Sequence, residues 1–112
     1  MLFRSNENSY ILYQNLNIKD YIFVHDTYAW QEQSLKIHTN LPIIKPNRDI
    51  TNNVFDYVDI IKNAQEIHCV DSCFYHLVEN MQLDNPKYYH DIRNLPGDKM
   101  PCSDSWTKID YE

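Results

Sequence analysis

The stretch that decides the fold is residues 67–81, IHCVDSCFYHLVENM. Its first four residues form a short apolar run, which is typical of a strand buried on both faces of a sheet. Directly afterwards, apolar residues recur at the i, i+3, i+4 and i+7 spacing of an amphipathic helix; they are Phe74, Leu77, Val78 and Met81. The pattern predicts a buried strand that passes through Asp71 and Ser72 into a helix.

Further elements are predicted on both sides of this strand–helix unit. Helical spacing is found in residues 5–16, where Ser5 can cap the helix, and in residues 54–64. Strands are predicted at 21–25, 34–38 (an edge strand), 42–45 and 87–90. Residues 26–30 are expected to form a loop, and Trp106 and Tyr111 are expected to anchor the C-terminal tail.

The alternation of strands and helices favours a parallel sheet joined by right-handed crossovers. The chain has 112 residues, which suits one domain spanning 1–112. We therefore expect an α/β fold, a three-layer Rossmann-like half-domain with a small, mainly parallel sheet. Phe74, Leu77, Val78 and Met81 should pack against that sheet.

Composition excludes several classes of function. With 43% hydrophobic residues, the chain has enough apolar material for a core. The 16 acidic residues outnumber the 10 basic ones and are spread along the chain, which disfavours a nucleic-acid-binding surface. The only glycine is Gly97, so neither a P-loop nor a GxGxxG turn is present.

Cysteine usage and hydropathy predict the compartment. The chain has an odd number of cysteines, Cys69, Cys73 and Cys102, and residues 1–10 lack the apolar core of a signal peptide. No apolar run approaches the roughly 18 residues of a membrane span. We therefore expect free thiols, no membrane span and a cytoplasmic location.

Candidate site residues follow the two most buried strands, because ligands of parallel sheets bind beyond the carboxyl ends of the strands. These residues are His25, Asp26, Asp71, Ser72 and Cys73. A diphosphate could accept the unpaired N–H groups of the helix that begins near Ser72. In the alternative interpretation Asp71 merely caps that helix, and its charge competes with a phosphate.

Other chemistries are less well supported by the spacing. His68 and Cys69 are neighbours on a strand and point to opposite faces, so they cannot both join Cys73 and His76 in a zinc site. No metal or cofactor is therefore expected. Cys73 at a helix N-terminus could act as a nucleophile, although Asp71 opposes thiolate formation.

His25 and Asp26 could form a proton-transfer pair if Asp26 lies in a loop. A histidine that is simply hydrogen-bonded at the sheet edge is the slightly favoured interpretation. The sequence does not indicate any catalytic residue.

Residues 59–78 resemble a recurring helix–strand–helix element in the C-terminal, nucleotide-sugar-binding half of GT-B glycosyltransferases of the fucosyltransferase-like or heptosyltransferase-like type. Residues 21–26 look like the opening strand of the same half, and the resemblance extends in order over residues 18–90. It implies that the step at Ser72-Cys73-Phe74 lies against the donor diphosphate. In this family Ser-Ser-Phe is more usual at that step, and an arginine is common where this chain has His25-Asp26; the next arginine is Arg48.

The resemblance implies a glycosyltransferase-like domain with a residual nucleotide-sugar site, which binds a nucleotide sugar or nucleoside diphosphate weakly and is not catalytic alone. The alternatives are a non-catalytic interaction module and a fragment of a longer glycosyltransferase. A half-domain leaves the face for its partner half exposed, so we also expect a homo-oligomer, formed through residues 28–30.

Overall fold

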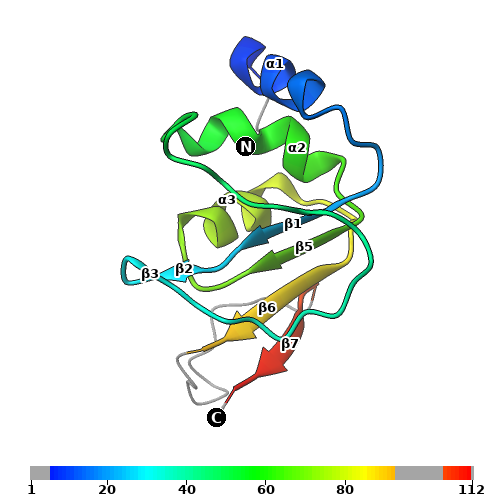
Figure 1. Cartoon of the computed structure of the whole chain (residues 1–112). Helices are drawn as coiled ribbons and strands as arrows, with labels where there is room; N and C mark the ends of the chain where they lie inside the picture. Colours follow the sequence, from blue (N-terminus) through cyan, green and yellow to red (C-terminus); the bar gives the residue numbers. More distant parts are fainter. Residues whose placement is uncertain (1–5, 93–104, 112) are drawn as a thin grey trace.

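The computed structural model describes residues 6–92 and 105–111. Ser5, Gly97 and Cys102 lie outside the described residues. The five strands of the main sheet are β1 (Ile22–His25), β4 (Ile43–Ile44), β5 (Glu66–Cys69), β6 (Lys87–Asp91) and β7 (Thr107–Asp110). They lie in the order β4-β1-β5-β6-β7, and every neighbouring pair is parallel (Figure 1). The expected α/β fold, a Rossmann-like half-domain with a parallel sheet, is confirmed.

The helices form one layer of the structure (Figure 1). They are α1 (Glu7–Leu16), the 3-10 helix η1 (Val54–Tyr57), α2 (Val58–Lys62) and α3 (Cys73–Met81). On α3, Phe74, Leu77 and Val78 are buried and Met81 is partly buried against the same core, as the spacing predicted. Alternate strand residues complete this core; they are Phe23, Ile67, Cys69 and Tyr89. Helix α1 contacts η1 and α2.

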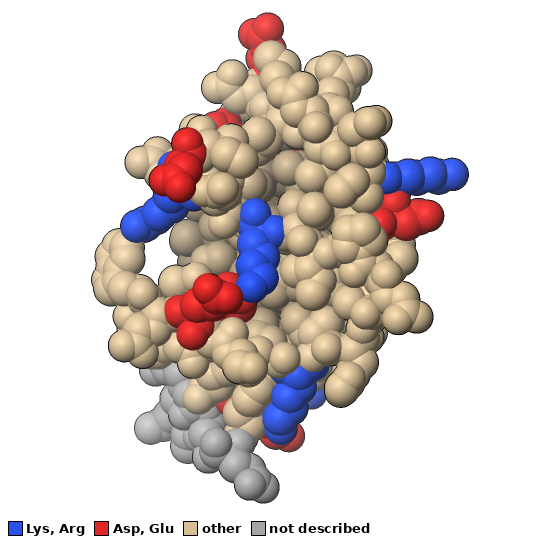
Figure 2. All heavy atoms as spheres, viewed as in Figure 1, with Lys and Arg blue, Asp and Glu red and all other residues tan. Residues whose placement is uncertain are grey.

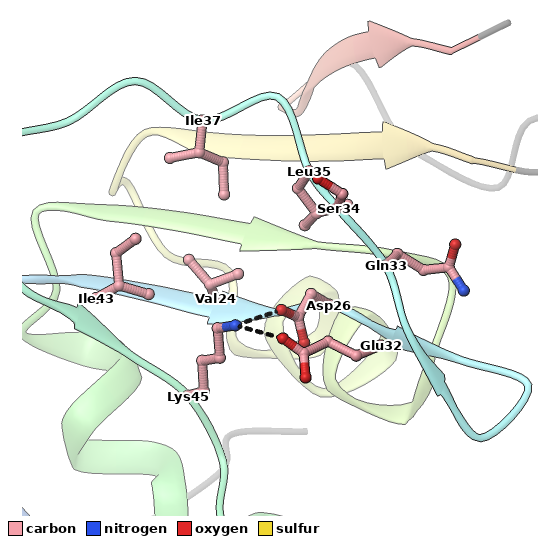
Figure 3. Close-up of a pocket in the computed structure, with 9 residues that line it drawn as sticks. All are labelled: Val24, Asp26, Glu32, Gln33, Ser34, Leu35, Ile37, Ile43 and Lys45. Atoms are coloured by element: carbon pink, nitrogen blue, oxygen red, sulfur yellow. Dashed lines mark hydrogen bonds and ion pairs between the residues drawn. The ribbon is translucent and has the colours of Figure 1, made fainter.

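The opposite face of the sheet is covered by an extended segment, residues 33–41, which we call the strap. Half-buried and exposed residues alternate along the strap: Leu35 and Ile37 are half-buried, while Ser34 and Lys36 are exposed. Leu35 and Ile37 lie over the sheet beside Val24 (Figure 3). The strap passes β7 at Lys36, whose ammonium donates to the Asp110 carbonyl at 2.8 Å. A layer of extended chain therefore covers this side of β1, and Val24 is only 2% exposed.

Two local predictions were wrong, and one strand was missed. Residues 34–38 form no edge strand, because the strap crosses the face of the sheet and does not pair along its edge. The expected loop at 26–30 instead holds β2 (Thr27–Tyr28) and the turn of a hairpin whose second strand is β3 (Gln31–Glu32). Strand β7 was not predicted, although its flanking residues do anchor the tail. Trp106 is 6% exposed against Tyr75, and its indole N–H donates to Glu79.

The two tryptophans give a stability test with a built-in control. Trp106→Ala should lower the free energy of unfolding by about 3–5 kcal/mol, since it removes a buried ring that joins β7 to α3. Trp30→Ala should change it by less than about 0.5 kcal/mol, because that ring is 80% exposed. Urea unfolding measures both values, and equal effects would contradict this description of the core.

Candidate functional site

The site is built on the carboxyl ends of β1 and β5. These strands pair in parallel from Ile22↔Glu66 to His25↔Cys69, and the Val70 amide then donates to the His25 carbonyl at 3.1 Å. The chain leaves β1 toward β4 on one side and returns to β5 on the other. This is the point at which the winding of the sheet reverses, where parallel α/β sheets leave a crevice for ligands.

Ser72 caps helix α3. Its backbone is extended, and its Oγ accepts the Tyr75 N–H at 3.4 Å, while its carbonyl accepts the His76 N–H at 3.2 Å. Ser72 and not Asp71 therefore caps the helix, and the Asp71 Oδ1 lies 3.9 Å from the His76 Nε2. The capping bond leaves the amides of Cys73 and Phe74 as donors in the first turn, at the positive end of the helix dipole.

His25 joins the two strand ends. Its Nδ1 lies 2.9 Å from the Ser72 Oγ, and its ring packs against Phe74 with centroids 4.7 Å apart. Burial lowers the pKa of His25 to about 4, and the nearby charge of Asp26 only partly opposes that shift. At neutral pH the imidazole is uncharged. Because Ser72 Oγ already accepts from Tyr75, its hydroxyl proton is available to His25 Nδ1.

Asp26 is part of an ion-paired cluster. Lys45 Nζ lies 2.6 Å from Asp26 Oδ2 and 3.2 Å from Glu32 Oε1 (Figure 3). The hydrogen bond to Asp26 raises the pKa of Lys45, with Glu32 contributing less. Asp26 is only 7% exposed, and the ion pair with Lys45 balances the charge of its carboxylate. The cluster borders a cavity of about 410 Å³ under the strap.

A larger cavity of about 900 Å³ lies on the other side of this cluster. All five residues expected from the sequence line it: His25, Asp26, Asp71, Ser72 and Cys73. The structure therefore brings both strand ends to one cavity, and their contact with a ligand stays a prediction. The lining residues that were not expected include Trp30, Lys45 and Arg48.

Trp30 and Arg48 are brought together by the β2–β3 hairpin. The turn consists of Ala29 and Trp30 with φ of 52° and 66°, the left-handed conformation that usually selects glycine or asparagine. This turn presents the Trp30 ring to solvent, and the Arg48 guanidinium carbon lies 4.6 Å from its centroid. An arginine and an aromatic face thus stand at the cavity, although both are remote from Ser72 in sequence.

The cysteines differ in their surroundings. Cys69 is buried, and desolvation raises its pKa, so this thiol is uncharged at neutral pH. Cys73 is exposed at the start of α3. Within residues 6–92 and 105–111, no three His, Cys, Asp or Glu side chains are grouped so that they could hold a metal ion.

The surface shows acidic and basic side chains interspersed over the face seen in Figure 2, with no large region of one sign. Among the described helices, none is long and apolar enough to cross a membrane.

Comparison with known proteins returned no match: no family model, no curated protein and no solved structure is significantly similar to the chain.

The role of Ser72 as a cap can be tested by substitution. Ser72→Ala should lower the free energy of unfolding by at least about 1 kcal/mol, because the Tyr75 amide loses its acceptor and His25 Nδ1 loses its partner. Ser72→Asn should retain most of the wild-type value, since asparagine caps equally well. Urea denaturation compares the three proteins, and an alanine variant as stable as wild type would show that the cap contributes nothing.

Proposed function

We propose that the chain is a glycosyltransferase-like domain that binds a nucleoside diphosphate or nucleotide sugar weakly in the 900 Å³ cavity and is not catalytic alone. The observation that carries the proposal is the meeting of three features at the β1–β5 crevice. They are the amino end of α3, the cations Lys45 and Arg48, and the exposed Trp30 ring. The resemblance of residues 59–78 to the donor half of GT-B enzymes supports the same ligand.

The diphosphate is assigned to the first turn of α3. The amides of Cys73 and Phe74 can donate to phosphate oxygens, and the helix dipole favours their negative charge. Arg48 supplies a cation that the strand end itself lacks, and Lys45 already neutralises Asp26. Asp71 adds a negative charge at the same end of α3, so the affinity should be poor, of millimolar order or about -4 kcal/mol.

The nucleoside is assigned to the hairpin side of the cavity. Trp30 is 80% exposed, and Arg48 covers its ring at 4.6 Å. A planar base can stack on an indole or on a guanidinium, because both present flat faces of low hydration. Base and diphosphate then both adjoin Arg48, which suits a nucleotide better than inorganic phosphate.

Two substitutions of opposite expected effect test the proposal. Asp71→Asn should tighten binding of UDP, GDP or ADP several-fold by removing like-charge repulsion. Arg48→Ala should weaken it about tenfold, since a hydrogen bond to a charged group contributes about 1.5–3 kcal/mol. Lys62→Ala is the matched control, because this exposed lysine lies at the end of α2 that precedes β5.

Amide shifts in NMR titrations up to about ten millimolar report the binding, roughly ten times the expected constant. The proposal requires shifts at Ser72 and Cys73 that respond to the first two substitutions and not to Lys62→Ala. If no nucleotide perturbs these amides in any of the proteins, the donor-site assignment is wrong, and the interaction-module alternative replaces it.

Self-association through residues 28–30 belongs to the same proposal. Trp30 is the most exposed of the large apolar residues described, and exposed apolar surface tends to be covered by a partner. Sedimentation velocity at high protein concentration should show a dimer or larger species, and Trp30→Ser should shift it toward monomer. A wild-type monomer at every concentration would contradict this part of the proposal.

A further inference from the structure

A chain of four side chains runs across the face of the sheet opposite the helices. Glu66 Oε1 lies 2.9 Å from His68 Nε2, and His68 Nδ1 lies 2.8 Å from His90 Nε2. His90 Nδ1 lies 2.6 Å from the Tyr111 hydroxyl, which accepts the Lys36 N–H at 2.6 Å. These hydrogen-bonded side chains therefore link β5, β6, the residue after β7, and the strap.

Donor and acceptor roles in this chain follow from its two ends. The Glu66 carboxylate can only accept, so His68 carries its proton on Nε2 and accepts at Nδ1. His90 must then donate from Nε2 and accept at Nδ1 from the Tyr111 hydroxyl. Because the Tyr111 oxygen accepts from Lys36, every group is satisfied when both imidazoles are neutral.

We propose that this chain is an acid-sensitive clasp, which holds the strap and the end of β7 on the sheet while both histidines are neutral and releases them when the histidines are protonated. With both imidazoles charged, His68 Nδ1–H and His90 Nε2–H point at each other across 2.8 Å, and His90 Nδ1 no longer accepts from Tyr111. Tyr111 then loses its bond to β6, and the strap loses the fixed acceptor of its Lys36 amide.

The surroundings of the two rings favour the neutral state at pH 7. Burial lowers the pKa of both, and for His90 the value falls to about 4, with the charge of His68 as a second cause. Tyr88 stacks on His68 at 4.7 Å and brings no charge. Among the four hydrogen-bonded side chains, Glu66 is the only carboxylate, and it favours protonation of His68. At the other end, the Lys36 ammonium lies 4.7 Å from the Tyr111 ring centroid.

The direction of the pH effect follows from these shifts. The unfolded chain binds protons on histidine near pH 6.5, whereas His90 in the fold binds its proton only near pH 4. The clasp therefore stabilises the fold fully above about pH 6.5, and this stabilisation is lost as the pH falls toward 4. Glu66 is partly exposed, so solvent protons can reach the hydrogen-bonded side chains at this end of the series.

Backbone ¹⁵N relaxation tests the clasp without any ligand. At pH 7 the amides of Lys36 and Tyr111 should be ordered, and at pH 4.5 they should become mobile while Ile67 and Val70 stay rigid. Tyr111→Phe should make Lys36 mobile at both pH values, because it removes only the hydroxyl. His38→Gln is the matched control, since it removes an exposed histidine from the same strap.

Three results would overturn the proposal. One is unchanged order of Lys36 and Tyr111 at pH 4.5, and another is loss of their order only together with Ile67 and Val70. The third comes from imidazole ¹⁵N shifts of the wild-type protein at pH 7, which should show both His68 and His90 protonated on Nε2. A proton on Nδ1 of either ring contradicts the chain, even if the Tyr111→Phe variant does not fold.

Discussion

The parallel pairing of β1 with β5 is the constraint on which the rest of the structure depends. Backbone hydrogen bonds close this pair at both ends, from Gln65 N to the Tyr21 carbonyl at 2.9 Å and from Val70 N to the His25 carbonyl at 3.1 Å. The register sets the two strand ends level, so that His25 reaches Ser72. A slip by one residue would turn every side chain of one strand to the opposite face and separate these two groups.

The same pairing assigns two kinds of chemistry to one strand. Along β5, Ile67 and Cys69 join the apolar core beneath the helices, whereas Glu66 and His68 face the strap and take part in the hydrogen-bonded chain. Burying polar groups is costly unless each one finds a partner, and here the histidines satisfy one another between a carboxylate and a phenol. The thin covering layer is thus held by specific polar bonds in addition to apolar contact.

The features that could be predicted from the sequence are those encoded by local patterns. The apolar runs gave β1 and β5, and helical spacing gave the buried face of α3. The strap shows the limit of such patterns. Half-buried residues such as Leu35 and Ile37 do alternate with exposed ones along it. This alternation does not distinguish a strand that pairs within a sheet from a segment that lies across the face of a sheet. The β2–β3 hairpin gave no signal, since Ala29 and Trp30 occupy turn positions where glycine or asparagine is usual.

The residues of the candidate site that directly follow a strand could be predicted from the sequence. Those that come from loops distant in sequence could not. Fold topology places His25 and Ser72 together from their positions after two strands, but Arg48 and Trp30 meet only through the hairpin and the loop after β4. Arg48 therefore lines the cavity from a part of the chain that is distant in sequence from both strand ends.

No two neighbouring strands of the main sheet are joined by a hairpin, and this has a consequence for how the chain acquires its structure. Tyr21 and Gln65, the first residues that are hydrogen-bonded across the β1–β5 pair, are 44 positions apart in sequence. Because so long a stretch must be ordered before this pair forms, the chain should fold slowly compared with a helical protein of the same size. Until β5 arrives, β1 can pair only with the two-residue strand β4, so the early collapsed state leaves one edge of its apolar run open to pairing with another chain.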